Sequence, residues 1–430
     1  MATERSFPDG FLWGSAGAAH QTEGDNTNSD WWAHEHERKS NAAEPSLAAC
    51  DSYNRFAEDW KLVADSGQNA VRLSIEWARI EPSPGEFSSN ELDHYREVIG
   101  TARDLGLTTS VTLHHFTNPN WFARRGGWDS DEAVEVFGRY VRTAADALGD
   151  LFQIVSTINE PSVVAVVGHL MGFFPPRITD VAATHRVTVN LLRAHAAAAD
   201  ALRAKNNTVV GLPLSVLDFY PTEDSPDGWK ARDFMHWSWV GVWLEALRTG
   251  QVRGLSVPDA TIPGLGGHDD FVGIQYYSRF DVHPAALGAA GSAADLVPNP
   301  VGARPAIPAA GERRTQMGWL WHPEGLGVVI DEVAETTGLP VQITENGIAT
   351  EDDEERIEFV GLHLAQVHQA IARGRDVRGY FYWSTLDNFE WNDGYRPTFG
   401  LIAVDRETMQ RTPKSSLSWY GGVARRNALG

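Results

Sequence analysis

Short apolar or β-branched runs recur along the chain and alternate with stretches of helical periodicity. The runs lie at residues 11–16, 69–75, 107–114, 152–158, 210–217, 271–276, 340–344 and 377–383. Between most of them, apolar residues return every three to four positions, as at 55–66, 131–148, 181–205 and 355–373. Near-continuous apolar strands that alternate with helices indicate a parallel sheet covered by helices. Eight such repeats predict an α/β protein with a closed (β/α)8 TIM barrel.

An open, doubly wound sheet is the alternative arrangement for this alternation. That fold normally carries a phosphate-binding loop after a strand, and neither GxGxxG nor GxxxxGK[ST] occurs in the chain. The Pro-, Ala- and Gly-rich stretch 282–311 has the composition of an interdomain linker, but two further strands follow it. We therefore expect one domain over residues 1–430, with long loops at the C-terminal face of the barrel. Residues 282–311 are expected to be one of these loops, and mobile.

Composition and charge limit which partners the protein can bind and in which cellular compartment we expect it. The formal net charge of −21 disfavours binding to nucleic acid or to anionic membranes. No apolar run approaches the ~18 residues that cross a bilayer. Cys50 is the only cysteine, which excludes an intrachain disulfide, and the first residues, MATERSFPDG, lack the apolar core of a signal peptide. We expect a cytoplasmic protein with neither a nucleic-acid nor a membrane partner; the sequence does not fix its oligomeric state.

Polar side chains follow most of the expected strands, at the end where such a barrel gathers its active site. They are Gln21 after the first run, His114 and His115 at the third, Asn159 and Glu160 at the fourth, Tyr277 at the sixth, Glu345 at the seventh, and Trp383 leading towards Glu390 at the eighth. Amide, imidazole and carboxyl groups are suited to sugar binding and to acid–base catalysis. The sequence therefore predicts an active site at these strand ends.

Glu160 and Glu345 fall immediately after the fourth and seventh expected strands. Hydrolysis of a glycosidic bond needs two carboxyl groups, one to protonate the leaving oxygen and one to meet the positive charge that develops on the sugar carbon. A single glutamate in such a position is usually a surface or helix-capping residue. Two glutamates in register with eight strands favour the catalytic interpretation.

Six sequence motifs give the chain a clear resemblance to a known enzyme family. The motifs are FLWGSAGAAHQTEG (11–24), VRLSIEWARIEPSPGEF (71–87), TLHHFTNPNWF with GGW (112–128), TINEP (157–161), QITENG (342–347) and YFYWSTLDNFEWNDGY with FGL (380–401). Together, and in this order, they resemble glycoside hydrolase family 1, the β-glucosidase family, over nearly the whole chain. The resemblance implies a retaining β-glycosidase without a cofactor. It would remove terminal non-reducing β-D-glucosyl residues, and also galactosyl or fucosyl residues, from β-glucosides and short oligosaccharides.

The resemblance also implies catalytic roles for five residues. Glu160 of TINEP would be the general acid/base, and Glu345 of TENG the nucleophile. Arg72 would keep Glu345 ionised, Tyr277 would donate a hydrogen bond to it, and Asn159 would hold the sugar 2-hydroxyl. Close carboxylates do not both ionise easily, so the pair would leave one proton on Glu160. A structural ion pair is the alternative explanation for Arg72.

The same resemblance implies a set of sugar-binding residues. A sugar presents hydroxyls at its rim and C–H groups on its faces, which suit carboxyl or amide groups and aromatic rings respectively. The substrate-binding residues would be Gln21, His115, Asn159, Trp383, Glu390, Trp391, Phe399 and Trp319. With 16 tryptophans in the chain, core packing is the alternative role for Trp383 and Trp319.

Three stretches suggest metal binding but lack the features of a metal site. His114 and His115 are adjacent on an expected strand, so their side chains would point to opposite faces. The HEHE stretch (34–37) is expected in a loop, with no further ligand motif to complete it. The acidic TEDDEER stretch (350–356) lacks the spacing of a calcium loop, and a solvated helix start explains it better. We expect no metal.

Two residues depart from the family's commonest pattern, and two alternative functions stay open. Gln275 replaces an asparagine and would shift Tyr277, and Phe116 replaces a tryptophan and so removes an N–H donor near the sugar. A 6-phospho-β-glycosidase of the same family would need phosphate-binding residues near Glu390, where this chain has FEWNDGYRPTFG. A catalytically silent sugar-binding protein would lack Glu160 or Glu345. The preferred sugar, the natural aglycone and transglycosylation are not determined.

Overall fold

Eight parallel strands close into a barrel in the order β10-β13-β14-β2-β3-β4-β5-β6. The computed structural model describes residues 5–205, 207–284, 303–305 and 311–430. The barrel strands are β2 (Leu12–Ala16), β3 (Ala70–Ser74), β4 (Thr108–Thr112), β5 (Ile154–Ser156), β6 (Val209–Ser215), β10 (Phe271–Gln275), β13 (Val341–Asn346) and β14 (Val377–Trp383). All eight predicted strands and the predicted TIM barrel are confirmed. The strands are short and mostly β-branched or apolar, as buried parallel strands are.

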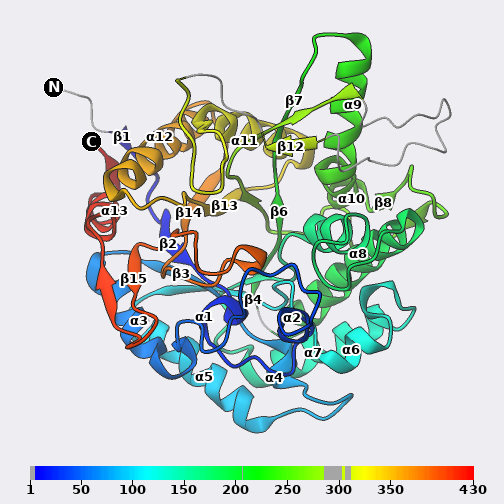
Figure 1. Cartoon of the computed structure of the whole chain (residues 1–430), viewed down its shortest axis with the longest axis horizontal. Helices are drawn as coiled ribbons and strands as arrows, with labels where there is room; N and C mark the ends of the chain where they lie inside the picture. The colour runs from blue at the N-terminus through cyan, green and yellow to red at the C-terminus, as the bar shows by residue number, and fades with distance from the viewer. Residues whose placement is uncertain (1–4, 206, 285–302, 306–310) are drawn as a thin grey trace.

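Helices form a layer around the barrel (Figure 1). They include α3 (Ser52–Ser66), α5 (Ser89–Asp104), α7 (Ala133–Leu148), α8 (Val181–Arg203), α10 (Val242–Thr249), α11 (Pro323–Thr337), α12 (Asp353–Ala372) and α13 (Ser415–Arg426). The four helices predicted from apolar periodicity correspond to α3, α7, α8 and α12. In α7 the buried side chains Val136, Tyr140 and Ala144 recur every four residues and so face the barrel.

The acidic stretch 350–356 begins α12, as predicted. The Asp352 side chain accepts a hydrogen bond from the backbone N–H of Glu354 at 3.0 Å, and Asp353 to Glu355 form an acidic first turn. Both features stabilise a helix N-terminus. Arg356 departs from the predicted solvated character, because it is buried and donates to the backbone carbonyls of Ile348 and Thr350 at 2.9 and 2.7 Å.

A small three-stranded sheet lies beside the barrel (Figure 1), and two of its strands come directly after the C-terminal ends of β6 and β10. It contains β7 (Asp218–Pro221), β11 (Arg279–Val282) and β12 (Ala303–Pro305), and α9 (Pro226–His236) packs against it. The stretch 282–311 was predicted to be loop throughout, and this is wrong for Val282 and for residues 303–305, which pair as strands. Residues 285–302 and 306–310 lie outside the described residues, so the predicted mobility there stays untested.

Shorter elements complete the described fold. They are α1 (Ala19–Thr22), α2 (Asp30–Glu35), α4 (Trp77–Ile80), α6 (Asn120–Arg124), η1 (Gly127–Asp129), η2 (Val163–Val167), η3 (Trp237–Gly241), η7 (Trp391–Asp393), β8 (Gln251–Val252), β9 (Ala260–Thr261), β15 (Ile402–Val404) and β16 (Arg411–Pro413). Near the two chain ends, β1 (Arg5–Ser6) pairs antiparallel with β17 (Ala428–Leu429). Among the described residues, no helix is long and apolar enough to cross a membrane. The single domain over residues 1–430 stays a prediction.

Candidate active site

The two predicted catalytic glutamates lie at the C-terminal ends of barrel strands. Glu345 is inside β13, one residue before the strand ends, rather than just after it as predicted. Glu160 follows β5 in the chain and has a left-handed backbone, with φ of 40°. A non-glycine residue in this region carries strain that the surrounding structure must hold, which is common at functional sites. Glu345 is buried, whereas Glu160 keeps part of its surface exposed.

Both carboxylate oxygens of Glu345 accept hydrogen bonds from neighbouring side chains. Oε1 accepts from Nη1 of Arg72 at 2.5 Å and from Nε2 of Gln275 at 2.8 Å. Oε2 accepts from the Tyr277 hydroxyl at 2.7 Å. The contacts of Arg72 and Tyr277 are those predicted from the sequence. Charge-assisted hydrogen bonds of this kind hold a carboxylate in one orientation and favour its ionised form.

Gln275 contacts the predicted nucleophile directly, whereas the sequence indicated only that it would shift Tyr277. Its Nε2 also donates to Oδ1 of Asn159 at 2.7 Å, and Arg72 donates to the same oxygen. Gln275 and Arg72 therefore both bridge Asn159 and Glu345. The remaining polar group of Asn159, Nδ2, lies 3.3 Å from Nε2 of His115.

The pKa values of the two glutamates are raised in different degrees. Burial, and then the negative charge of Glu345, raise the pKa of Glu160 well above 4.5. Burial also raises the pKa of Glu345, but the Arg72 charge and the hydrogen bonds from Tyr277 and Arg72 oppose this shift. The first proton taken up by the pair therefore belongs to Glu160. An acid and a neighbouring carboxylate are the two states that glycoside cleavage requires.

A further contact to Glu160 was not found from the sequence. Ser215, the last residue of β6, forms a side-chain hydrogen bond with Glu160 that opposes the rise of its pKa. A single serine at a strand end carries no distinctive sequence signal. Its position at the C-terminal end of a barrel strand was the only feature that could have pointed to it.

Gln21 and Glu390 meet on one side of the site. Nε2 of Gln21 donates to the backbone carbonyl of Phe389 at 2.8 Å and lies 3.5 Å from Oε2 of Glu390. Oε1 of Gln21 is buried without a hydrogen-bond partner among the described residues. Burial, and then the charge of Glu345, raise the pKa of Glu390 to about 8, although hydrogen bonds from Trp383 and Gln21 oppose this. Near neutral pH Glu390 is therefore largely protonated and can both donate and accept.

Aromatic rings converge on His115. Its ring is nearly parallel to those of Trp383 and Trp391, at 17° and 13°, with centroids 6.0 and 6.1 Å away. Trp391 also contacts Phe116 at 5.1 Å and stacks on His20 at 5.6 Å. Burial lowers the pKa of His115 well below 6.5, so its ring is neutral. These rings give the site flat apolar surface beside polar groups.

Trp319 and Phe399 lie near Tyr277. The Trp319 ring centroid is 5.6 Å from that of Tyr277 and 6.4 Å from that of Phe399. Phe399 is buried, and Trp319 is half-buried. The structure therefore brings the predicted residues into two connected groups, one around Glu345 and one around His115.

The stretches considered for metal binding have other partners. His114 and His115 follow β4 rather than lying on it, and Nε2 of His114 lies 3.1 Å from Oδ1 of Asn118. The HEHE stretch is not all loop, because its first two residues end α2, where Glu35 lies 2.6 Å from His20. Within the described residues, no group of three or more His, Cys, Asp or Glu side chains is placed to hold a metal ion.

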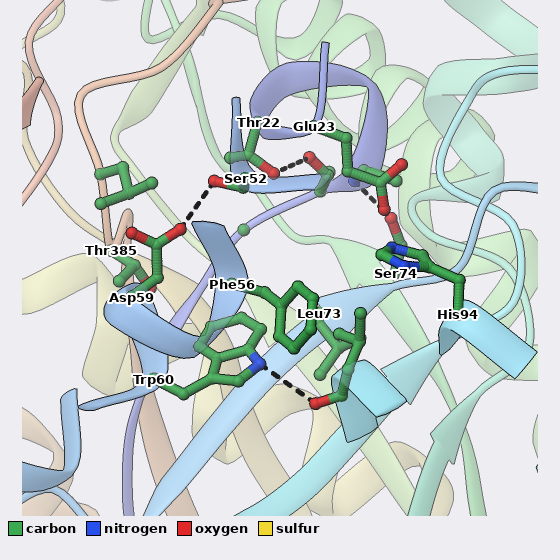
Figure 2. Close-up of a pocket in the computed structure, with 15 residues that line it drawn as sticks. Thr22, Glu23, Ser52, Phe56, Asp59, Trp60, Leu73, Ser74, His94 and Thr385 are labelled. Carbon is green, nitrogen blue, oxygen red and sulfur yellow. Dashed lines mark hydrogen bonds between the residues drawn. The ribbon is translucent and has the colours of Figure 1, made fainter. Parts of the chain in front are cut away.

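A different pocket lies between β3 and the helices α3 and α5 (Figure 2). Phe56, Trp60 and Leu73 form its apolar side, and Glu23 and His94 lie on the other (Figure 2). Its volume is about 40 Å³, which admits water but not a sugar ring. The strand-end site, rather than this pocket, therefore carries the candidate chemistry.

Comparisons with known proteins agree with the geometry. The chain is 34% identical to Beta-glucosidase A of Thermotoga maritima, with 99% of each chain covered. The structure resembles that of a β-glycosidase from Pyrococcus horikoshii, at 36% identity and a TM-score of 0.92, covering 100% of this chain and 97% of that one. It equally resembles a family 1 β-glucosidase from Thermotoga maritima, at 32% identity and a TM-score of 0.92, with 100% of both chains covered. That Thermotoga enzyme has also been solved in complex with glucoimidazole and with deoxynojirimycin. The profile of Glycosyl hydrolase family 1 matches residues 3–429, and the chain belongs to this family of glycoside hydrolases.

Proposed function

We propose that the protein is a retaining β-glucosidase that acts on small β-glucosides and short oligosaccharides. The observation that carries this proposal is the pair of unequal carboxyl groups. Glu345 is held by Arg72, Gln275 and Tyr277, while Glu160 has the more strongly raised pKa. The β-glucosidase names of the relatives support glucose as the sugar.

The first step forms a covalent glycosyl-enzyme. Glu345 attacks the sugar carbon, and Glu160 gives its proton to the departing glycosidic oxygen. Hydrogen bonds from Arg72, Gln275 and Tyr277 fix the direction of attack. Gln275 and Arg72 both donate to Oδ1 of Asn159, which fixes the orientation of this amide, so its Nδ2, beside His115, is the group that it offers to the sugar 2-hydroxyl.

The second step returns the enzyme to its first state. Esterification removes the charge of Glu345, which is the second-largest cause of the raised pKa of Glu160. Glu160 then loses its proton more easily and acts as a base towards water. The product keeps the configuration of the substrate, because two displacements occur at the same carbon.

Sugar recognition is assigned to polar and aromatic residues from both groups. Gln21, His115 and Glu390 supply polar groups for the hydroxyls, Trp383 and Trp391 supply apolar surface, and Trp319 with Phe399 flanks the aglycone. The unpartnered Oε1 of Gln21 supports this assignment, because a buried acceptor without a partner is unfavourable until a hydroxyl fills it. We also propose a cytoplasmic location, supported by the single, buried thiol of Cys50.

The test is mass spectrometry after incubation with a 2-deoxy-2-fluoro-β-glucosyl donor, which slows breakdown of the covalent intermediate. We expect one glucosyl adduct per chain, on the peptide that contains Glu345. The control is the Glu345→Gln variant, which should stay unlabelled. Labelling on another residue would refute Glu345 as the nucleophile. If neither the glucosyl nor the galactosyl donor labels the protein, the proposed β-glucosidase activity is refuted. A phosphosugar substrate or a catalytically silent binding protein would then be favoured.

A further inference from the structure

A second cavity lies between α8 and the α9–η3–α10 segment. Its volume is about 310 Å³, at the lower end of the range for small-molecule pockets. Its walls include the aliphatic side chains of Leu170, Val181 and Leu255 and the rings of Phe234 and Trp237. The planes of these two rings differ by 26°, and their centroids lie 6.3 Å apart. None of the residues proposed to bind sugar lines this cavity.

The hydroxyl groups at the cavity are already engaged. Thr184 donates to the carbonyl of Asp180 at 2.8 Å, Thr188 to that of Thr184 at 2.9 Å, and Ser238 to that of Met235 at 3.0 Å. A sugar would leave several of its own hydroxyls without partners on such walls, which is unfavourable in an apolar site. The cavity therefore fits an apolar molecule with few polar atoms.

His185 lines the cavity and carries one further hydrogen-bond donor. Its Nδ1 accepts from the backbone N–H of Ser256 at 2.7 Å and lies 2.6 Å from the Ser256 hydroxyl. A neutral imidazole that accepts at Nδ1 carries its proton on Nε2. Burial lowers the pKa of His185, which favours this neutral form. One N–H group of this kind matches the single oxygen of an alcohol.

The first wall of the cavity is connected to the backbone of Glu160. Val166 lines the cavity and belongs to the π-helical turn η2. At the start of this turn the N–H groups of Val163 and Val164 both donate to the carbonyl of Glu160, at 2.9 and 3.3 Å. Such π-helical turns occur frequently at functional sites. A change at this wall therefore reaches the strained backbone of the proposed acid.

The opposite wall is connected to the carboxyl group of Glu160. Trp237 and Ser238 line the cavity, and both belong to a second π-helical turn, η3. The next residue, Trp239, donates its indole N–H to the carbonyl of Ser215 at 3.0 Å. The side chain of Ser215 forms the hydrogen bond with Glu160 described above. Both walls of the cavity are therefore connected through hydrogen bonds to Glu160.

We propose that this cavity binds a planar aromatic alcohol, the chemical class of an aromatic aglycone, and that its occupation changes acid catalysis by Glu160. The choice of an aglycone-like ligand rests on the proposed function. The cavity and its two connections to Glu160 do not depend on it.

The binding test is calorimetric titration of the full chain with 2-naphthol. Val181→Phe and Leu255→Trp each fill the cavity from a different wall, and Val328→Phe is the matched control because Val328 is 50% exposed on α11. We expect the wild type and Val328→Phe to bind equally. Both filled variants should bind 2-naphthol at least tenfold more weakly. Their circular dichroism should match the wild type, and their kcat/KM for 4-nitrophenyl β-glucoside should stay within twofold of the wild-type value. Unchanged binding in both filled variants, or no binding to the wild type, would overturn the proposal.

A kinetic test separates this cavity from the active site. Saturating 2-naphthol should lower kcat at least twofold for an alkyl β-glucoside, whose leaving group needs a proton, and less for 4-nitrophenyl β-glucoside. Val181→Phe should abolish the effect. Purely competitive inhibition that survives in Val181→Phe would place the alcohol in the active site and refute the coupling. The protein could also bind 2-naphthol, lose this binding in both filled variants, and yet hydrolyse no glycoside. That result would support the cavity as a binding site and refute only the proposed function.

A third experiment tests whether the cavity binds the free alcohol but not its glycoside. In the Glu345→Gln background, 2-naphthyl β-glucoside should bind equally with and without Val181→Phe, because its sugar does not fit the cavity. Weaker binding of the glycoside in the filled variant would show that the cavity accepts substrates, which contradicts the assignment to a free alcohol.

Discussion

The side-chain amide of Gln275 donates a 2.8 Å hydrogen bond to Oε1 of Glu345, and a bulge sets the two residues side by side. In the pairing of β10 with β13, Ile274 is opposite Ile343, but Gln275 is opposite Glu345, so one residue of β13 is left over. A bulge re-aims the side chains that follow it and is common next to active sites. Here it brings the carboxylate within reach of the amide.

Replacing Gln275 should therefore affect the nucleophile itself. Gln275→Leu keeps the volume but removes the donor, and we expect kcat/KM to fall about 10- to 100-fold, as for loss of a hydrogen bond to a charged group. The acidic limb of the pH–rate profile should move to higher pH, because the ionised form of Glu345 loses a donor. Gln275→Asn, whose side chain is one methylene shorter, should have a kcat/KM between those of the wild type and Gln275→Leu. An acidic limb that does not move in Gln275→Leu would contradict this role.

Glu345→Ala tests the nucleophile by chemical rescue. We expect turnover to fall by about 10⁴-fold or more, the scale seen when a catalytic nucleophile is removed. Azide fits the space of the lost carboxylate and attacks the sugar directly, so activity should return with an α-glucosyl azide as product. Nuclear magnetic resonance of the product reports its configuration. An unassisted, active Glu345→Ala variant would show that another residue is the nucleophile.

Glu160→Gln tests the proton donor through the leaving group. The variant should lose about 10²- to 10⁴-fold in kcat/KM for alkyl glucosides, the usual range for general acid catalysis. Dinitrophenyl glucoside needs little protonation, so its first step should be almost unaffected. The measurement is a series of aryl glucosides of graded leaving-group pKa. Equal losses across the series would rule out acid catalysis by Glu160.

The two steps should also differ in their pH dependence. Burial and the charge of Glu345 raise the pKa of Glu160, and the charge is absent in the glycosyl-enzyme. Reactivation of the fluoroglucosyl-enzyme needs ionised Glu160, so its rate should rise with pH. The midpoint of this rise should lie at least one pH unit below the alkaline limb of kcat/KM, which reports Glu160 beside the ionised Glu345. Coincident midpoints would mean that Glu345 does not set the pKa of Glu160.

The barrel and its strand-end residues could be predicted because their signals are local and repeated. Each strand is a short apolar run, and residues such as Glu160 and Glu345 follow from the rule that active sites gather at strand ends. The contact of Gln275 with Glu345 could not be predicted, because it depends on a bulge that shifts pairing by one residue. The cavity beside α8 was also missed, since it joins residues that are far apart in the sequence and ordinary in type.

Glu390 should make the stability of the fold depend on pH. Burial, and then the charge of Glu345, raise its pKa from 4.5 to about 8. Between these two values the folded protein holds a proton that the unfolded chain releases. The free energy of unfolding should therefore decrease as pH rises from 4.5 to 8, by at most about 1.4 kcal/mol per pH unit from this residue. Below pH 4.5 the residue is protonated in both states, and its contribution becomes constant.

Glu390→Gln should remove this part of the slope, because an amide does not titrate. Urea unfolding at a series of pH values measures the effect, and Glu86→Gln, at an exposed glutamate, is the control. Some slope should remain in Glu390→Gln, since burial also raises the pKa of Glu23 to about 7 and that of Asp30 to about 6. A stability profile of Glu390→Gln that runs parallel to the wild type over pH 5 to 8 would show that Glu390 is ionised in the folded protein. Its role as a neutral donor to the sugar would then be wrong.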